Sequence, residues 1–291
     1  MPDESFRLLQ WQNNIHDTEV VAADGNRRSF IGSGHVWHYH SQMELTLVVE
    51  GSGIRFIGDA ITQVHAPELV LIGPNLPHYW DMPQHTAGYA IQFDFPSQHP
   101  FWAFPETAGL ATLWKDARCG LHFSGPVVQK VTGLIRASLN CGRLGRLARF
   151  LRILDLLSQT APEHRETLSS GIFAPPARQA TYQSLQKAIN FVFNGFQNDI
   201  AFSDVLREAH MSKATFERHF KKHTGKTFTG FLAEVRLNFA SRQLVETDRP
   251  IGEIALASGY NNLSHFNHQF KALHRLTPQA FRKRNSGALN A

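Results

Sequence analysis

The carboxyl-terminal part of the chain carries one pattern twice, 50 residues apart. An internal repeat limits a chain to architectures built from copies of one unit, so it constrains this fold more than any other feature. Four of the six matched positions hold large apolar side chains, as a shared core requires. The matched pairs are Leu206 and Leu256, Phe216 and Phe266, Phe220 and Phe270, Lys221 and Lys271, Thr227 and Thr277, and Phe231 and Phe281.

Each copy predicts a helix-turn-helix unit. In the first copy, residues 205–209 predict a short helix, residues 210–212 a turn, and the following residues a second helix to about His223. In the second copy, the turn lies near residues 258–260. Apolar residues between Phe231 and Leu244 predict one longer helix that joins the two units.

The second helix of each unit carries a phenylalanine pair at i, i+4 spacing, which predicts a core-facing side. At about 100° per residue, the opposite side is then determined. It offers Arg, Lys, Asn, Ser and Glu, the side chains that contact base edges in a major groove. The predicted DNA-binding residues are Lys213, Ala214, Glu217, Arg218 and Lys221 in the first unit and Ser264, His265, Asn267, His268 and Lys271 in the second.

The distribution of charge supports a polyanionic partner for this end of the chain. Residues 1–110 contain 4 Lys and Arg against 12 Asp and Glu, a net charge of −8, whereas residues 181–291 contain 15 against 8, a net charge of +7. Lys213, Lys222, Lys226 and Lys283 are suited to phosphate contacts. The alternative is that these are solvated basic surfaces, which charge alone does not exclude.

The amino-terminal part reads as short strands separated by Gly, Pro and Asn turns. Residues 45–49, 54–57, 69–72 and 87–95 are the clearest strand segments. Regularly spaced short strands predict a small antiparallel barrel or jelly roll.

A histidine cluster lies within this β-rich part. His38 and His40 are two positions apart, so a strand would point both to one face, and Glu44 is a further even step away. His78, after a Pro-rich turn, could complete a site for a divalent metal such as Zn, Fe, Mn or Ni. The alternative is a metal-free pocket in which these side chains hydrogen-bond a small molecule or one another.

The spacing Gly32-x5-His38-x-His40-x3-Glu44-x6-Gly51 resembles the first cupin motif, and residues 74–78 resemble a shortened second motif that lacks its usual glycine. The resemblance implies a barrel whose matching His and Glu residues bind a metal or a ligand.

Residues 108–160 predict a helical connector, because apolar residues recur there at three- and four-residue steps. Its helices could cap the barrel, pack on a second subunit, or do both. Pro162, Gly171 and the pair at residues 175–176 predict a linker over 161–180. The predicted organisation is a sensor domain at 1–107, the connector, the linker, and an all-α domain with two helix-turn-helix units at 181–291.

Residues 251–284 resemble the signature of the AraC-type transcription regulators, through Ile254-Ala255, Gly259-Tyr260, Phe266, Phe270-Lys271, Pro278 and Phe281-Arg282. The resemblance implies a DNA-binding domain at about residues 181–285, preceded by a sensor and dimerisation region. Relatives often carry Arg where this chain has His268, which weakens the prediction of base reading by the second unit.

Other features limit where the chain acts. No stretch approaches about 18 uninterrupted apolar residues, so no membrane span is predicted. The start of the sequence lacks the pattern of a secretory signal, and Cys119 and Cys141 lack metal-pair spacing, so we expect reduced thiols in a cytoplasmic protein.

Together these features predict a sequence-specific transcription regulator, not an enzyme, whose cupin-like domain senses a small molecule. The expected partners are double-stranded DNA and an unidentified effector, with RNA polymerase and a second copy of the chain as further candidates. The alternative is a metal-dependent cupin oxygenase or isomerase with a basic helical tail. The histidine cluster favours the alternative, and the doubled helix-turn-helix favours the regulator.

Overall fold

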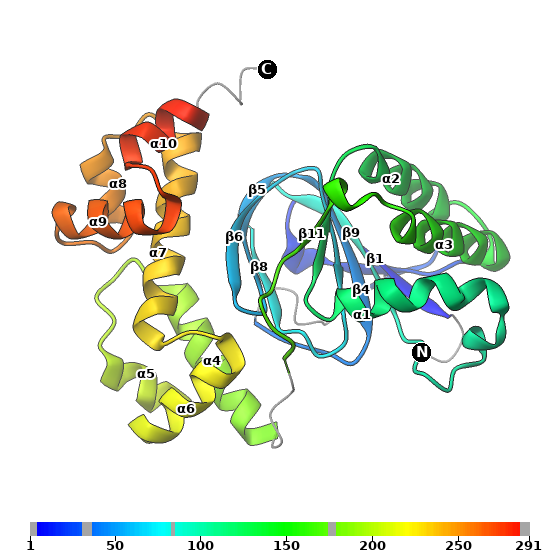
Figure 1. Cartoon of the computed structure of the whole chain (residues 1–291), viewed down its shortest axis with the longest axis horizontal. Helices are drawn as coiled ribbons and strands as arrows, with labels where there is room; N and C mark the ends of the chain where they lie inside the picture. Colours follow the sequence, from blue (N-terminus) through cyan, green and yellow to red (C-terminus); the bar gives the residue numbers. More distant parts are fainter. Residues whose placement is uncertain (1–4, 31–36, 83–84, 174–178, 286–291) are drawn as a thin grey trace. The chain divides into compact units, whose positions relative to one another are not determined.

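The computed structural model describes residues 5–30, 37–82, 85–173 and 179–285. It divides into two compact units, residues 1–60 with 64–175 and residues 61–63 with 176–291. The first contains helices α1 to α3 and the strands, apart from residues 61–63 of β6, and the second contains helices α4 to α10 (Figure 1). The predicted combination of an antiparallel, sheet-rich region with a helical domain is confirmed.

The strands of the described residues form two sheets. The larger has the order β11-β10-β7-β4-β9-β1-β2-β3 and the smaller the order β6-β5-β8. Neighbouring strands pair antiparallel, for example β4 with β9 and β5 with β8. The strands are β1 (Phe6–Trp11), β2 (Glu19–Val21), β3 (Arg27–Ser29), β4 (Met43–Glu50), β5 (Ser52–Ile57), β6 (Ala60–His65), β7 (Glu68–Ile72), β8 (His78–Asp81), β9 (Ala87–Phe93), β10 (Leu121–Phe123) and β11 (Arg165–Thr167).

The two sheets enclose a common apolar core. Leu9, Val70 and Ala90 of the larger sheet belong to the same buried cluster as Ile57 and Trp80 of the smaller one. Because successive side chains on a strand point to opposite faces, the alternate residues of the larger sheet form a second core on its outer face. A layered antiparallel sandwich of this kind leaves its interior available for a pocket.

Helices cover the outer face of the larger sheet. Val131, Ile135, Phe150 and Leu154 pack in one buried cluster with Leu45 and other outward residues of the strands. The connector helices therefore cap the sheets, one of the two roles expected for them (Figure 1). They are α1 (Ala111–Ala117), α2 (Pro126–Ser138) and α3 (Arg143–Ser158), with short 3-10 turns at Ile15–Asp17, Pro100–Ala103, Pro105–Leu110 and Pro162–His164.

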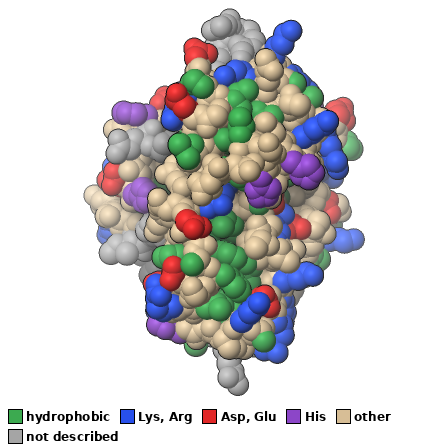
Figure 2. All heavy atoms as spheres, turned by 90° about the vertical axis from the view of Figure 1, so that its left-hand side faces the viewer, with side chains coloured by type: hydrophobic (Ala, Val, Ile, Leu, Met, Phe, Trp, Pro, Cys, Tyr) green, Lys and Arg blue, Asp and Glu red, His purple; other side chains and the backbone are tan. Residues whose placement is uncertain are grey.

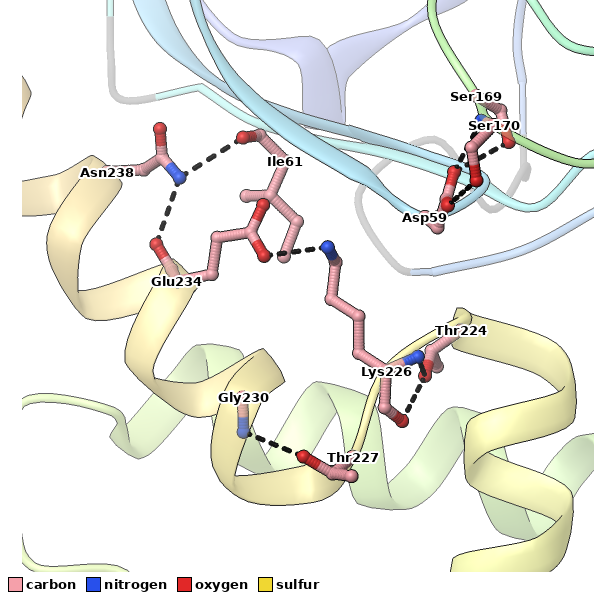
Figure 3. Close-up of polar contacts among 10 residues, drawn as sticks. All are labelled: Asp59, Ile61, Ser169, Ser170, Thr224, Lys226, Thr227, Gly230, Glu234 and Asn238. Atoms are coloured by element: carbon pink, nitrogen blue, oxygen red, sulfur yellow. Dashed lines mark hydrogen bonds and ion pairs between the residues drawn. The ribbon is translucent and has the colours of Figure 1, made fainter. Parts of the chain in front are cut away.

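The region predicted as a linker, 161–180, is partly ordered into the first unit. Strand β11 pairs with β10 at the edge of the larger sheet. Beyond it, Ser169 Oγ and Ser170 N donate hydrogen bonds to Asp59 Oδ1 at 2.8 and 2.9 Å (Figure 3). Residues 175–176, which contributed to the linker prediction, lie outside the described residues.

The second unit contains the predicted pair of helix-turn-helix elements, α5–α6 and α8–α9, joined by the long helix α7. Phe216 and Phe220 of α6 and Phe266 and Phe270 of α9 are fully buried, as their spacing predicted. The helices are α4 (Gln179–Gly195), α5 (Phe202–Ala209), α6 (Lys213–Thr224), α7 (Phe228–Glu246), α8 (Ile251–Ala257), α9 (Leu263–His274) and α10 (Pro278–Asn285).

One matched pair of the repeat was wrong. Helices α6 and α9 begin 50 residues apart, but α5 and α8 begin at Phe202 and Ile251, which are 49 apart. Val205 therefore corresponds to Ile254, and both are buried, whereas Leu256 is 64% exposed. The two first helices are offset because the second unit has a longer turn before its second helix.

Two further features concern the chain as a whole. In the described part of the chain, no helix has the length and apolar character needed to span a membrane. Cys119 and Cys141 are free thiols.

Candidate functional site

The histidine cluster is assembled by backbone pairing between two segments distant in sequence. His38 and His78 form an isolated antiparallel bridge, with His38 N donating to His78 O at 3.1 Å and His78 N donating to His38 O at 2.8 Å. His40 follows two residues on, and its carbonyl accepts from Asn75 N at 2.8 Å. One ring nitrogen from each of the three histidines lies within 4.8 Å of the others. The structure therefore brings together the three predicted imidazoles.

His78 presents a free ring nitrogen to this cluster. Its Nδ1–H donates to Leu76 O at 2.8 Å, so Nε2 carries the lone pair. Nε2 is buried and has no hydrogen-bond partner among the described residues. Burial and the neighbouring His38 hold the pKa of His78 well below its ordinary value. A neutral imidazole with an unused, buried nitrogen is in the form that binds a metal.

Glu44 is held differently from the histidines. Its Oε1 accepts from Thr46 Oγ1 at 2.7 Å, and its Oε2 accepts from Gln92 Nε2 at 2.8 Å and lies 3.2 Å from His40 Nε2. Burial opposes ionisation, but the hydrogen bond and charge of His40 and the hydrogen bond from Gln92 hold the pKa of Glu44 well below its usual range. Glu44 lies outside the group of three converging imidazole nitrogens, and its structural role is to fix His40.

Both ring nitrogens of His40 face acceptors. Nδ1–H donates to Gln42 O at 3.0 Å, and Nε2 faces the Glu44 carboxylate. Burial lowers the pKa of His40, but the hydrogen bond and charge of Glu44 outweigh it, so the pKa is raised. His40 and Glu44 therefore form a partly buried pair whose nearest atoms lie 3.2 Å apart.

The residues that sequence reasoning missed lie beside Glu44 in the sheet. The register places Gln92 directly opposite Glu44 on one side and opposite Arg7 on the other. Arg7 NH1 donates to Gln92 Oε1 at 3.3 Å. One signal could have found Arg7, because it is one of only 4 basic residues in the first 110 and lies between apolar residues in a strand.

These side chains border a cavity of about 450 Å³. Its polar residues include Arg7, His38, His40, Glu44 and Gln92. Its apolar wall is formed by Leu9, Trp11, Ile15, Phe30, Trp80 and Ala90. A cavity of this size and mixed character is typical of a small-molecule site.

Of the two glycines in the cupin-like motif, Gly51 lies in a turn that requires glycine. Gly51 has a φ of +101°, and a Cβ there would lie 2.6 Å from Thr86 Cγ2, so only glycine fits this turn. Gly32 lies outside the described residues.

The predicted DNA-binding residues form an exposed face on each unit. All ten are exposed: Lys213, Ala214, Glu217, Arg218, Lys221, Ser264, His265, Asn267, His268 and Lys271. They lie opposite the buried phenylalanines that fix α6 and α9 in their cores. On the face of the molecule drawn in Figure 2, Lys and Arg side chains (blue) recur along the right-hand edge.

Two of the predicted residues have partners within the protein. His265 Nε2 lies 2.9 Å from Gln269 Nε2, and Gln269 in turn accepts from the Tyr260 hydroxyl. Lys226, predicted as a phosphate contact, forms an ion pair with Glu234 at 2.8 Å (Figure 3). These two side chains are therefore less available for DNA than Arg218 or Lys213, which form no ion pair with any described residue.

Comparison with known proteins agrees with this geometry. Residues 205–284 match the model of a family described as a helix-turn-helix domain, a range that runs from α5 to α10. The HTH-type transcriptional activator RhaS of Pectobacterium atrosepticum is 22% identical over 255 residues, covering 84% of this chain and 86% of that protein. An uncharacterized HTH-type transcriptional regulator of Haemophilus influenzae is 34% identical over 99 residues, 34% of this chain and 33% of that protein.

Among solved structures, ToxT from Vibrio cholerae O395 is similar over 97% of this chain and 99% of its own, with 10% identity and a TM-score of 0.38. The DNA-binding domain of AdpA, in complex with a target DNA, is similar over 35% of this chain and 92% of its own, with 22% identity and a TM-score of 0.34.

Proposed function

We propose that this chain, a DNA-binding transcription regulator with an AraC-family helix-turn-helix domain, adjusts its binding to DNA when a small molecule enters the cavity of its sheet domain. The observation that carries the proposal is the pair of exposed recognition faces, each backed by a buried phenylalanine pair. Such units place their second helices in successive major grooves, about 34 Å apart. The relatives are named as transcription regulators, so the chain is a regulator and not an enzyme.

The cavity supplies the sensing part of the proposal. A ligand can change DNA binding only if it binds more tightly to one state of the protein than to another. His38 and His40 line the cavity, so a bound molecule has polar groups to contact there, and the ring of His78 lies next to them with an Nε2 that has no hydrogen-bond partner among the described residues.

We further propose that a divalent first-row metal, Zn, Fe, Mn or Ni, binds the three histidines. The unused Nε2 of His78 and the convergence of three ring nitrogens fit such an ion. His40 would have to turn one ring nitrogen from its present partner, Gln42 O or Glu44, toward the ion. A bound cation would supply a fixed positive charge and open positions for a ligand.

The proposal also includes two further partners, a second copy of the chain and RNA polymerase. Leu144 and Leu151 on α3 are 79% and 40% exposed, which supports a second copy of the chain packing on this helix. Activation through RNA polymerase is proposed because the RhaS relatives are named activators. A DNA partner and free thiols support a cytoplasmic location.

Selection of DNA fragments by the purified full-length chain, at a stated salt concentration, tests DNA recognition. We expect enriched fragments to bind at least about 10³-fold more tightly than bulk DNA. If the protein binds all fragments as tightly as bulk DNA, it is not a sequence-specific regulator.

A reporter fused to the enriched site tests sensing. We expect reporter output to vary across a panel of carbon sources with the wild type and to stay constant with His78→Ala. His65→Ala, which changes an exposed histidine of β6, should behave as the wild type. Equal responses from all three proteins would show that His78 has no role in sensing.

Elemental analysis of the purified protein tests the metal separately. We expect about one ion per chain in the wild type and in His65→Ala, and a large loss in His78→Ala. The same metal content in all three would place the ion elsewhere.

A further inference from the structure

Arg7 is a charged group of the cavity that no acidic side chain in the described part of the chain neutralises. It lies on β1 with the apolar Leu9 and Trp11 on the same face of the strand. Its guanidinium donates to the neutral amide of Gln92 and lies 5.2 Å from the ring centroid of Phe30. Among the described residues, no carboxylate forms an ion pair with it.

Glu44, the acidic residue in the described lining of the cavity, has other partners. Glu44 pairs with His40 at 3.2 Å and also accepts from Thr46 and Gln92. Glu44 is therefore engaged by three neighbouring side chains, whereas Arg7 forms no ion pair with any described residue.

The Arg7–Gln92–Glu44 chain also fixes the direction of the guanidinium. These three residues lie side by side on the adjacent strands β1, β9 and β4. Gln92 donates a hydrogen bond from its amide nitrogen to Glu44, and its amide oxygen accepts one from Arg7. An arginine so oriented retains further N–H donors, and a carboxylate can accept two of them at once.

The cavity also has an apolar and aromatic wall, beside the polar side chains of His16, Thr18, Ser29 and Tyr39. Trp11, Ile15, Phe30 and Trp80 offer a surface for a hydrocarbon or aromatic body. A hydroxyl group packed against Ile15 or Phe30 would meet no polar side-chain atom of these residues, at a cost for each buried group.

We propose that the effector is a small carboxylate with an apolar or aromatic body, whose carboxylate pairs with Arg7 and whose body packs against the aromatic wall. This inference rests on the proposed function of the cavity as a sensor. It deepens that function by naming the chemical class of the ligand.

Binding of matched probes to the full-length protein tests the class. Calorimetry would compare benzoate, 3-phenylpropanoate and hexanoate with the corresponding amides, and with the neutral pentose D-ribose. We expect at least one carboxylate to bind at least about 10-fold more tightly than its amide, because the charge-assisted pair is lost in the amide. Absence of a carboxylate preference throughout the panel, or tighter binding of D-ribose, would overturn the proposal.

Variants locate the anion within the cavity. Arg7→Gln should abolish the preference, and Arg7→Lys should retain part of it because it keeps the charge without the planar fork. Arg28→Gln, an exposed residue of β3, is the matched control and should leave binding unchanged. A preference that survives Arg7→Gln and disappears with a chelator would assign the anion to the histidine cluster and contradict the role of Arg7.

Binding to the selected DNA fragment distinguishes a wrong ligand class from a wrong proposed function. If D-ribose rather than a carboxylate alters binding to that fragment, the sensor function stands and the ligand class is wrong. If the protein selects no fragment, the proposed function itself fails.

Discussion

Arg236 Nε lies 2.7 Å from the carbonyl oxygen of Phe196, and NH2 of the same guanidinium lies 2.7 Å from that of Asn198. Arg236 belongs to α7, whereas Phe196 and Asn198 follow the end of α4. The guanidinium also lies 5.9 Å from the ring centroid of Tyr260, in the turn of the second helix-turn-helix. One side chain therefore joins the segment that precedes the first unit to the turn of the second.

Gly259, next to Tyr260, should tolerate no side chain. It has a φ of +84°, and an added Cβ would lie 2.6 Å from Phe196 O and 2.8 Å from Arg236 Nε. We expect Gly259→Ala to lower the free energy of unfolding by about 1–3 kcal/mol, measured by urea denaturation. Gly252→Ala is the control, because a Cβ there meets nothing within 4 Å in helix α8, and it should stabilise by about 0.5–1 kcal/mol. Equal effects of the two substitutions would contradict this account of the turn.

Arg218 should read bases in the first half of the site. Its guanidinium is exposed on α6 and can donate to guanine O6 and N7 together. We expect Arg218→Ala to weaken binding to the selected fragment by about 1–3 kcal/mol and to relax base preference in one half of it. Arg136→Ala removes the same charge from an exposed position on α2 and should leave binding unchanged. Similar losses from both variants would mean that net charge, not base contact, governs affinity.

Lys213 and Lys226 should differ in their contributions to phosphate binding. Lys213 is exposed at the start of α6, whereas Lys226 is paired with Glu234 at 2.8 Å. Each phosphate contact releases counterions, so its loss lowers the dependence of affinity on salt. We expect Lys213→Ala to weaken binding uniformly across sequences and to reduce the salt slope by about 1, while Lys226→Ala leaves the slope unchanged. The measurement is a set of binding titrations between about 50 and 200 mM salt, the range over which this effect is large. A smaller salt slope for Lys226→Ala than for Lys213→Ala would show that the assignment is wrong.

His274 should make the second helix-turn-helix less stable in acid. Its Nε2 lies 2.7 Å from Ser241 Oγ, and burial lowers the pKa of its imidazole in the folded state. The unfolded chain therefore takes up the proton at higher pH than the folded chain, so stability falls as pH drops below the ordinary histidine value of about 6.5.

The measurement is urea unfolding of wild type and His274→Gln at several pH values between neutral and mildly acidic. We expect the wild type to lose more stability over this range than His274→Gln, which cannot be protonated. Ser241→Ala keeps the imidazole and should retain the steeper decline. Identical slopes for wild type and His274→Gln would exclude His274 as a source of acid sensitivity.

The helical domain could be predicted from sequence because its information is local. Phe216 and Phe220 must lie on one side of any helix that contains them, so the exposed residues of α6 follow from periodicity alone. The repeat then transferred the same reasoning to α9. It failed only at Leu256, because a longer turn shifts the first helices of the two units by one residue.

The contacts around the cavity could not be predicted from local sequence patterns, because they join residues that are distant in sequence. Arg7 and Gln92 are 85 residues apart, and only the register of β1 with β9 brings them together. Strand β11 was likewise predicted as part of a linker, because three residues carry too little alternation to identify a strand. The histidines were found because their motif is compact, but the pairing of Glu44 with Gln92 depends on the sheet.

Helix α7 has a consequence for the DNA sites that this chain can recognise. It has 19 residues and is therefore about 28 Å long, and it carries one recognition unit at each end. Each added residue would advance the second unit by about 1.5 Å and turn it by about 100° around the helix axis. One inserted residue would thus put the two recognition helices out of rotational phase with the DNA groove. Four residues would nearly restore the phase and move the second helix by about 6 Å, close to two base-pair steps. The length of α7 therefore sets both the spacing and the angular relation of the two half-sites.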